Sequence, residues 1–258
     1  MVKISSETCF NADYFTIPVV GIAADMPTHD SGPHSHSRHQ LLFSTTGCMT
    51  IEMEKTLYLL PARRAMWIPA GVVHRVMMRG VTAYRSLYFS IDLPFSKTPL
   101  QVFSVNALLF EIIERMSFWP WTMPTDYQNN ILNVFIDELH TAPKENWDLK
   151  FPQDDRLSIW IEQVHQGILP LRLNVLAKKI GACERTISRI FIRDTGMNYQ
   201  SWRQQWRLLK GMEMLADNKS TNEIAQFLDF SSDSAFIAFF RQYTGVTPNN
   251  YNALPFLT

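Results

Sequence analysis

The C-terminal part of the chain contains an internal repeat. Each copy has an apolar–alanine pair, then two apolar residues spaced four apart, then a glycine: Leu176-Ala177, Ile187, Phe191 and Gly196 in the first copy, and Ile224-Ala225, Phe236, Phe240 and Gly245 in the second. This pattern predicts a short helix, a tight turn and a second helix in each copy, which together form a helix-turn-helix motif. We place the two motifs at about residues 173–195 and 221–244.

The segments around the repeat predict how the two motifs are joined. An amphipathic stretch from Tyr199 to about Asp217 predicts one continuous helix. Such a helix would hold the motifs rigidly toward successive major-groove faces, which lie about 34 Å apart. The turn of the first motif has Gly181, which adopts the left-handed conformation easily, whereas Asp229 at the matching position tolerates it less well. The sequence Ser-Thr-Asn-Glu at 220–223 predicts a capping box.

The second helix of each motif is the one that enters the major groove of DNA. Six side chains are therefore expected to meet base edges: Arg185, Ser188, Arg189, Asp233, Ile237 and Ala238. An arginine can donate to both O6 and N7 of guanine. Four nearby cations are better placed for phosphates: Lys178, Lys179, Arg193 and Arg241. The alternative is a plain helical bundle with solvated arginines, but two copies bridged by one helix argue against it.

Charge and composition are consistent with a DNA-binding part joined to a second domain. Residues 156–258 contain twelve Lys and Arg and eight Asp and Glu, a net charge of +4, so the rest of this neutral chain carries −4. Cys9, Cys48 and Cys183 are scattered, which predicts free thiols in a reducing cytoplasm. The sequence has no basic-then-apolar leader and no apolar run near the roughly 18 residues of a membrane span, so no membrane partner is expected.

Residues 156–254 resemble the DNA-binding domain of the AraC/XylS family of transcription regulators. The family's C-terminal signature is present as DFSSDSAFIAFFRQYTGVTPNNY, with these matching positions: Phe230, Ser232, Ser234, Phe236, Phe240, Gly245, Pro248 and Tyr251. Two positions depart from the family. Asp229 stands where the family often has glycine, and Ala238 stands where many members have arginine. We therefore expect the first motif to do most of the sequence reading, and the second to read by shape and apolar contact.

The N-terminal half reads as strands. Between residues 14 and 92, short runs rich in Val, Ile, Thr and aromatic residues alternate with turn residues, which predicts an antiparallel barrel or sandwich. The segment also resembles a cupin-type barrel of the kind that AraC-like regulators use to sense ligands. The first cupin motif appears as His34-x-His36, Gln40 and Gly47, and the second as Pro69-x-Gly71-x-x-His74. The effector pocket implied by this resemblance contains His34, His36, Gln40 and His74, and Trp67 is added as pocket wall because it lies beside the second motif.

Three interpretations of His34, His36 and His74 remain open. They line a ligand pocket, they bind zinc or iron, or they are structural residues bonded to the backbone. Gln40 stands where metal-binding cupins have a glutamate, and a neutral amide is a poorer ligand for a divalent cation. No cofactor is therefore expected, with zinc or iron as the alternative. His39 is expected on the surface.

Two helices are predicted between the barrel and the C-terminal domain. The first has apolar residues at Val105, Leu108, Leu109, Ile112, Ile113 and Met116, and the second at Tyr127, Ile131, Val134, Phe135 and Leu139. They resemble the dimerisation element of the family, and packing against the barrel is the alternative. The polar, proline-containing stretch at 141–155 is predicted to be a linker.

These observations predict an α+β chain with two domains. Residues 1–98 form a cupin-like sensor barrel, 99–140 a helical pair that dimerises, and 156–258 an all-α tandem helix-turn-helix domain. The expected function is a cytoplasmic, homodimeric transcription regulator that binds double-stranded DNA in response to a small-molecule effector, and contacts RNA polymerase if it activates. It is not expected to be an enzyme, because no general acid/base partner or nucleophile stands out near the histidines. The alternative is a metal-dependent cupin enzyme with a helical appendage.

Overall fold

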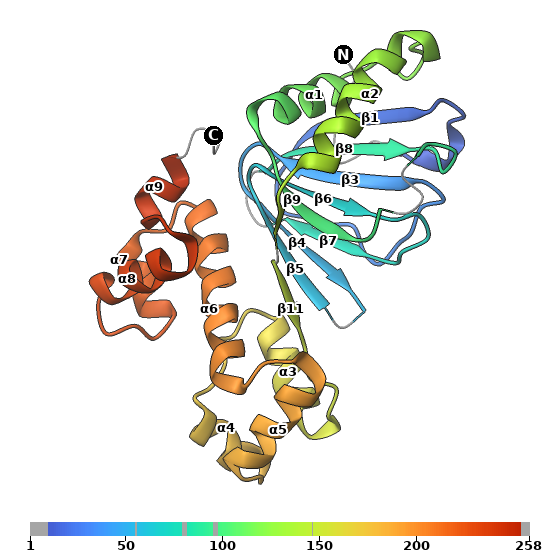
Figure 1. The fold of residues 1–258 in the computed structure, drawn as a ribbon. Coiled ribbons are helices and arrows are strands. Elements are labelled where there is room, and N and C mark those ends of the chain that lie inside the picture. The colour runs from blue at the N-terminus through green and yellow to red at the C-terminus, as the bar shows by residue number, and fades with distance from the viewer. Residues whose placement is uncertain (1–9, 55, 79–81, 95–97, 146, 254–258) are drawn as a thin grey trace. The chain divides into compact units, whose positions relative to one another are not determined.

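The computed structural model describes residues 10–54, 56–78, 82–94, 98–145 and 147–253 (Figure 1). It separates into two compact units. Of these residues, the first unit holds 10–54 and 59–147, and the second holds 56–58 and 148–253. Cys48 is buried and Cys183 is exposed, and neither forms a disulfide within the described residues, whereas Cys9 lies outside them. In the described part of the chain, no helix is long and apolar enough to cross a membrane.

The first unit is built on antiparallel strands, which confirms its predicted sheet-rich fold. After the short helix η1 (Ala12–Tyr14), the chain forms two sheets. The six-stranded sheet has the order β1 (Val19–Met26), β8 (Thr82–Phe89), β3 (His39–Ser44), β6 (Arg64–Ile68), β9 (Gln101–Ser104) and β10 (Lys144–Glu145). The five-stranded sheet has the order β11 (Asp148–Lys150), β5 (Thr56–Pro61), β4 (Cys48–Met53), β7 (Arg75–Met78) and β2 (His29–Asp30).

The register of the six-stranded sheet separates its two faces. Leu41 pairs with Trp67 and Leu87, whereas Gln40 pairs with Ile68 and Tyr88. Because side chains alternate along a strand, these two sets point to opposite faces. The Leu41 face carries the core of this unit, together with helices α1 (Ala107–Ser117) and α2 (Thr125–Thr141). The Gln40 face belongs to the candidate ligand site described below.

The helical pair packs on the sheet of its own unit. Helix α1 buries Leu109, Ile112, Ile113 and Met116 in that core, while Leu108 is 50% exposed. The predicted apolar face of α1 therefore packs mostly within its own unit, which was the alternative interpretation, and dimerisation through the helical pair stays a prediction. The buried face of α2 also differs from the apolar face predicted from the sequence. The helix buries Gln128, Leu132, Phe135 and Leu139, and leaves Tyr127 and Val134 exposed.

The predicted linker at 141–155 is structured. In β10, Lys144 pairs with Phe103 of β9, and in β11, Leu149 pairs with Leu57 of β5. A short helix, η2 (Asp155–Leu157), follows. Leu149 and Phe151 are buried. Removing these two apolar side chains from water stabilises the ordered conformation of the segment.

The second unit is all-α after β11, as predicted. Its helices are α3 (Ser158–His165), α4 (Leu173–Ile180), α5 (Glu184–Thr195), α6 (Tyr199–Ala216), α7 (Thr221–Phe227), α8 (Asp233–Thr244) and α9 (Pro248–Ala253). Helices α4 and α5 form one helix-turn-helix, and α7 and α8 form the other. The long helix α6 connects them (Figure 1).

Local conformation agrees with the capping and turn signals of the sequence. The capping box at the start of α7 is present, with Ser220 and Glu223 bonding each other's backbone N–H, so that prediction is confirmed. Both turns are left-handed at the matching positions, with φ of 66° at Gly181 and 60° at Asp229. Asp229 thus holds a conformation that glycine would adopt with less strain.

Candidate functional site

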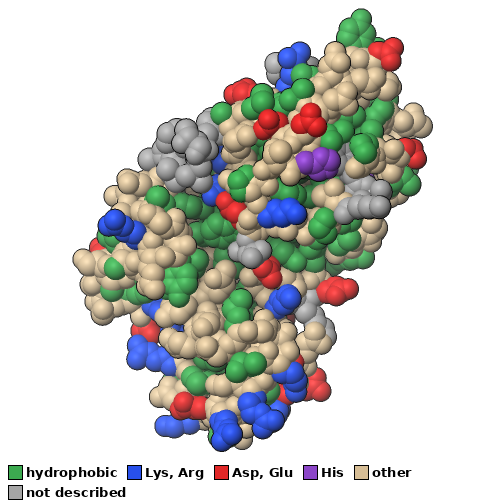
Figure 2. Space-filling model, viewed as in Figure 1, with side chains coloured by type: hydrophobic (Ala, Val, Ile, Leu, Met, Phe, Trp, Pro, Cys, Tyr) green, Lys and Arg blue, Asp and Glu red, His purple; other side chains and the backbone are tan. Residues whose placement is uncertain are grey.

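Helix α5 exposes a cationic edge. Ile187, Ile190 and Phe191 are buried against the rest of the unit, while Arg185 and Arg189 are exposed on the other side and Ser188 is half-buried. Among the described residues, neither exposed guanidinium has an ion-pair partner. Figure 2 shows Lys and Arg side chains gathered over the part of the molecule where Figure 1 places α4 and α5.

The four predicted phosphate contacts are not equally available. Lys178 and Arg241 are exposed. Lys179 is exposed too, but its Nζ donates to Oε1 of Gln163 at 2.9 Å. Arg193 pairs with Asp194 at 2.6 Å and lies 3.8 Å from Asp154. A phosphate would have to compete with these carboxylates for Arg193.

Helix α8 offers a different surface from α5. It buries Phe236 and Phe240, and leaves Ala238 and Arg241 exposed and Ile237 half-buried. Ile237, Ala238 and Arg241 line one shallow hollow. Asp233, in the first turn, accepts a hydrogen bond from Nδ2 of Asn222 at 3.0 Å. The middle of this helix is thus apolar and small, and suits contact with a thymine methyl group better than hydrogen bonding to bases.

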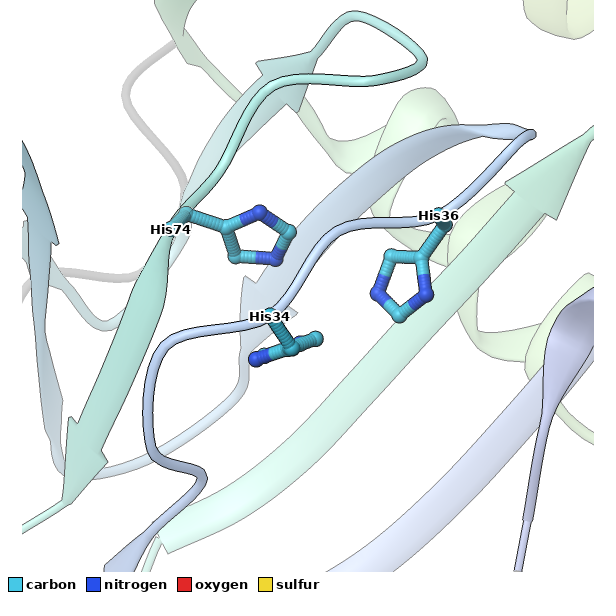
Figure 3. A group of neighbouring side chains, drawn as sticks. All are labelled: His34, His36 and His74. Carbon is cyan, nitrogen blue, oxygen red and sulfur yellow. The ribbon is translucent and has the colours of Figure 1, made fainter.

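In the first unit the structure brings His34, His36 and His74 together (Figure 3). His34 and His74 face each other across an isolated antiparallel bridge, with both backbone N–H···O bonds at 2.9 Å. One nitrogen from each of the three rings lies within 4.8 Å of the others. The resemblance to the two cupin motifs therefore grouped three histidines that the structure also brings together.

Hydrogen bonds fix the tautomers of two of these rings. Nδ1 of His34 lies 2.9 Å from the carbonyl oxygen of Gly32, and Nδ1 of His74 lies 2.9 Å from that of Val72. A carbonyl oxygen can only accept, so each neutral ring carries its proton on Nδ1 and keeps a lone pair on Nε2. Burial and the two neighbouring imidazoles lower the pKa of His36 to about 4, and burial also lowers the pKa of His74.

Gln40 adds an amide group beside the three imidazoles. Its Nε2 donates to the Ser86 hydroxyl and to the Tyr88 hydroxyl, both at 3.0 Å. The Tyr88 ring in turn packs edge-on against His36, with centroids 5.0 Å apart. Oε1 of Gln40 and Nε2 of both His36 and His74 are buried, with no hydrogen-bond partner among the described residues. Oε1 of Gln40 and Nε2 of His74 are therefore buried acceptors that a ligand with donors would satisfy.

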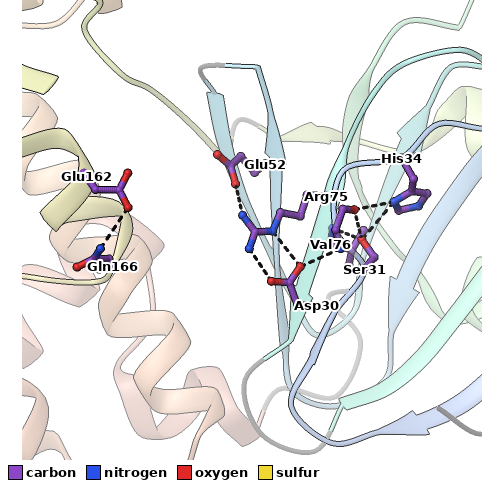
Figure 4. A network of polar contacts seen from close by, with 9 residues as sticks. Asp30, Ser31, His34, Glu52, Arg75, Val76, Glu162 and Gln166 are labelled. Atoms are coloured by element: carbon purple, nitrogen blue, oxygen red, sulfur yellow. Dashed lines mark hydrogen bonds and ion pairs between the residues drawn. The ribbon is translucent and has the colours of Figure 1, made fainter. Parts of the chain in front are cut away.

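A network of polar contacts holds the loop that precedes His34 (Figure 4). The Ser31 hydroxyl lies 3.2 Å from Nδ1 of His34 and accepts from the backbone N–H of Val76. Next to it, Arg75 bridges Asp30 at 2.6 Å and Glu52 at 3.5 Å. These contacts hold the loop before His34 against β7.

Two sequence predictions about this site are corrected. Trp67 does not line the cluster, because it points to the opposite face of the sheet from Gln40 and is fully buried in the core. His39 is not on the surface. It is 6% exposed, stacks on Trp67 with centroids 5.4 Å apart, and accepts at Nδ1 from the backbone N–H of Ala70.

Sequence reasoning missed Ser86 and Tyr88 as members of the site. They lie on β8, and only the pairing of β8 with β3 places them beside Gln40. The alternation of β8 alone predicts that Ser86 and Tyr88 share a face. It does not predict which strand lies next to them.

The three imidazoles fit the donor set of a transition metal. Neutral imidazole is a common ligand of zinc and iron, and three of them leave a fourth position for water or another ligand. The hydrogen bonds from Nδ1 to backbone carbonyls are the usual supporting contacts of such ligands. Tetrahedral zinc, with bonds of about 2.0–2.1 Å, would draw the nitrogens to about 3.3 Å apart.

Comparison with known proteins agrees with this arrangement. Residues 16–96 match the AraC-like ligand binding domain, and residues 176–253 match a helix-turn-helix domain. The chain is similar to the HTH-type transcriptional regulator NimR of Escherichia coli, with 27% identity over 85% of this chain and 81% of the relative. It is 30% identical to the HTH-type transcriptional regulator RipA of Corynebacterium glutamicum, over 83% of this chain and 62% of the relative.

Solved structures that match the chain include one of ToxT from Vibrio cholerae, with 10% identity, a TM-score of 0.36, and coverage of 92% of this chain and 98% of that one. Another is the DNA-binding domain of AdpA in complex with a target DNA, with 24% identity, a TM-score of 0.35, and coverage of 39% of this chain and 92% of that one. The two matched domains and the two curated relatives decide the assignment: the chain is a member of the AraC/XylS family of transcriptional regulators, with an N-terminal ligand-binding domain and a C-terminal helix-turn-helix DNA-binding domain.

Proposed function

We propose that this regulator recognises its operator mainly through α5, and that an effector held by the His34–His36–His74 cluster and Gln40 controls the binding. The observation that carries the first part is the exposed cationic edge of α5, whose opposite side is buried in a helix-turn-helix unit. Arg185, Ser188 and Arg189 meet base edges. Ile237 and Ala238 of α8 contribute apolar contact, and Lys178, Lys179 and Arg241 bind phosphates.

An operator selected from random duplexes with the wild-type protein tests the role of α5. A bidentate arginine–guanine contact is worth about 1–3 kcal/mol, so Arg189→Ala should weaken operator binding by about 5- to 150-fold at fixed salt. It should also reduce the preference for operator over random DNA. Arg156→Ala removes the same charge from a side chain that pairs with Asp154, and serves as the control. Wild-type affinity and preference in Arg189→Ala, measured by fluorescence anisotropy, would refute the role of α5.

The effector is a small polar molecule that donates hydrogen bonds, such as a hydroxyl or amino compound. The buried acceptors Oε1 of Gln40 and Nε2 of His74 support this, because leaving them unpaired costs free energy that a donating ligand would recover. Such a ligand can shift the equilibrium between two conformations of the regulator only if it binds one conformation more tightly than the other. A thermal-shift screen of polyols and amines tests this. Gln40→Leu should abolish the shift, while His29→Ala, outside the cluster, should keep it.

A divalent transition metal is the second candidate, favoured by the unpaired buried Nε2 atoms and by the Nδ1 bonds to backbone. Titration calorimetry with zinc chloride or ferrous sulfate tests it directly. We expect one ion per chain, with binding lost in His36→Ala and His74→Ala and kept in His140→Ala. Absence of stoichiometric binding to the wild-type chain would exclude the metal and leave the polar effector.

We further propose that the chain regulates rather than catalyses, and that it acts as a homodimer in the cytoplasm, where chromosomal DNA lies. Among the described residues, the cluster that could hold a metal consists of imidazoles only, without a carboxylate to act as base. Dimerisation would place two DNA-binding domains on repeated half-sites and raise their effective concentration. Light scattering of the purified protein tests the dimer. If the regulator activates transcription from its operator, it also contacts RNA polymerase.

A further inference from the structure

Asp229 contacts elements of both helix-turn-helix motifs. It lies in the turn between α7 and α8, and its carboxylate accepts hydrogen bonds from Arg172, with Nη2 at 2.9 Å and Nε at 3.1 Å. Arg172 is the residue directly before α4 of the first motif. The same carboxylate lies 3.5 Å from Nη2 of Arg203 on α6. One acidic side chain therefore connects the start of the first motif, the connecting helix and the turn of the second.

Two buried arginines on α6 complete this arrangement. Arg203 and Arg207 are one turn apart and each is 6% exposed. Nε of Arg203 donates to the carbonyl oxygen of Pro170, just before the first motif, at 2.8 Å. Arg207 donates to the carbonyl oxygens of Leu228 and Asp229, and its guanidinium lies 3.6 Å from the Phe230 ring centre. Buried guanidinium groups need such partners, so these loops are held to α6.

The charge cluster sits where a sharp turn alone would favour glycine. Asp229 has φ of 60°, which glycine adopts at less cost. An aspartate there brings strain, but it also brings the carboxylate that reaches Arg172. Because Arg172 and Asp229 are both exposed, their ion pair contributes little to folding stability. Its consequence should appear in the relative placement of the two motifs.

We propose that the Asp229–Arg172–Arg203 cluster sets the distance between operator segments at which both motifs bind together. This rests on the proposed function, since it assumes that α5 and α8 both enter the major groove of one duplex. Adding one base pair between the two operator segments both shifts one segment along the duplex and rotates it around the helix axis. A protein that holds its two motifs rigidly therefore binds both segments at only one spacing. A protein without the cluster should tolerate neighbouring spacings better.

The test uses the full chain and a set of operator duplexes in which the distance between the two segments is changed by one base pair in either direction. Fluorescence anisotropy at fixed salt gives the ratio of affinities for the best and the shifted spacing. Asp229→Asn is the variant of choice, because asparagine also accepts the left-handed conformation but carries no charge. We expect this ratio to fall by about 1.4- to 5-fold, the range expected for one exposed ion pair. Asp217→Asn is a control with the same charge change on the same unit.

Partner variants show whether the pair itself is responsible. Arg172→Gln should lower the ratio as much as Asp229→Asn, and the double variant should lower it no further, because both remove one interaction. Arg172→Lys, which keeps the charge but loses the bidentate fork, should lie between. A wild-type ratio in Asp229→Asn would overturn the proposal, as would a loss of affinity that is equal at all spacings.

Two measurements separate this proposal from the proposed function. A duplex with only the α5 segment should bind Asp229→Asn and wild type alike, whereas Arg189→Ala should bind it poorly. If Arg189→Ala binds every duplex as well as wild type, the proposed reading role of α5 is wrong. The ratio of affinities for the best and the shifted spacing would still test the role of the Asp229–Arg172 pair. Thermal unfolding checks that each variant is folded, and we expect melting temperatures close to wild type for Asp229→Asn and Arg172→Gln.

Discussion

Gly21 on β1 lies directly against the backbone of α1. A Cβ atom at this position would lie 2.1 Å from the carbonyl oxygen of Met116, which is helix backbone and cannot turn aside. Gly21→Ala should therefore destabilise the protein by about 1–3 kcal/mol through overpacking. Gly211→Ala is a contrasting variant, since its Cβ would meet the Phe236 side chain at 3.2 Å and the helix gains from alanine. Urea unfolding of both variants checks this, and equal losses would contradict it.

Single residues of the candidate site were predictable where a motif fixed their spacing. His34, His36 and His74 follow from the two cupin motifs, and the structure places their rings together. Trp67 was assigned by its closeness in sequence to the second motif, but alternation along β6 sends it to the other face. His39 was assigned to the surface because it alternates only loosely with His36 and Arg38. Instead it is buried, with Nδ1 accepting from the backbone N–H of Ala70 and the ring stacked on Trp67.

At the scale of elements, α2 gives a direct test of which face is buried. Phe135 is fully buried and stacks on Phe89 with centroids 5.1 Å apart, whereas the adjacent Val134 is 41% exposed. Phe135→Ala should cost about 3–5 kcal/mol of unfolding free energy through the cavity that it leaves. Val134→Ala should cost well under about 1 kcal/mol. Similar costs for the two, from denaturant unfolding, would mean that the helix is rotated toward the stripe predicted from the sequence.

The longer elements were predictable because their periodicity is strong. The two helix-turn-helix motifs and α6 lie where the repeat, the periodicity and the capping box placed them, and β1 to β8 lie within the segment predicted to be rich in strands. Short strands such as β9, β10 and β11 were not predictable, because two to four residues have no period and their pairing partners are distant in sequence. On α2 the buried Gln128 misled the periodicity. Its side chain bonds the backbone of Val19 and Met123, which no local pattern shows.

At the scale of the whole molecule, charge is divided between the two parts of the chain. The net charge is zero, but residues 156–258 carry +4. A neutral protein can still bind DNA, because the cations concentrate on one unit and charges farther away than about 10 Å are screened at moderate salt. The strength of binding should then depend on the few cations that meet phosphates, rather than on the net charge.

The salt dependence of operator binding tests this count of phosphate contacts. Each contact releases counterions, so the slope of log K against log salt is about −0.9 per phosphate neutralised. Lys178→Ala should make the slope shallower by about 0.9. Arg193→Ala should change it by less, because Asp194 already pairs with that guanidinium at 2.6 Å in the free protein. Lys219→Ala, in the turn before α7, should leave it unchanged. Equal changes for Lys178→Ala and Arg193→Ala would show that DNA displaces Asp194, and that the ion pair on the surface of the free protein does not decide which cations meet phosphates.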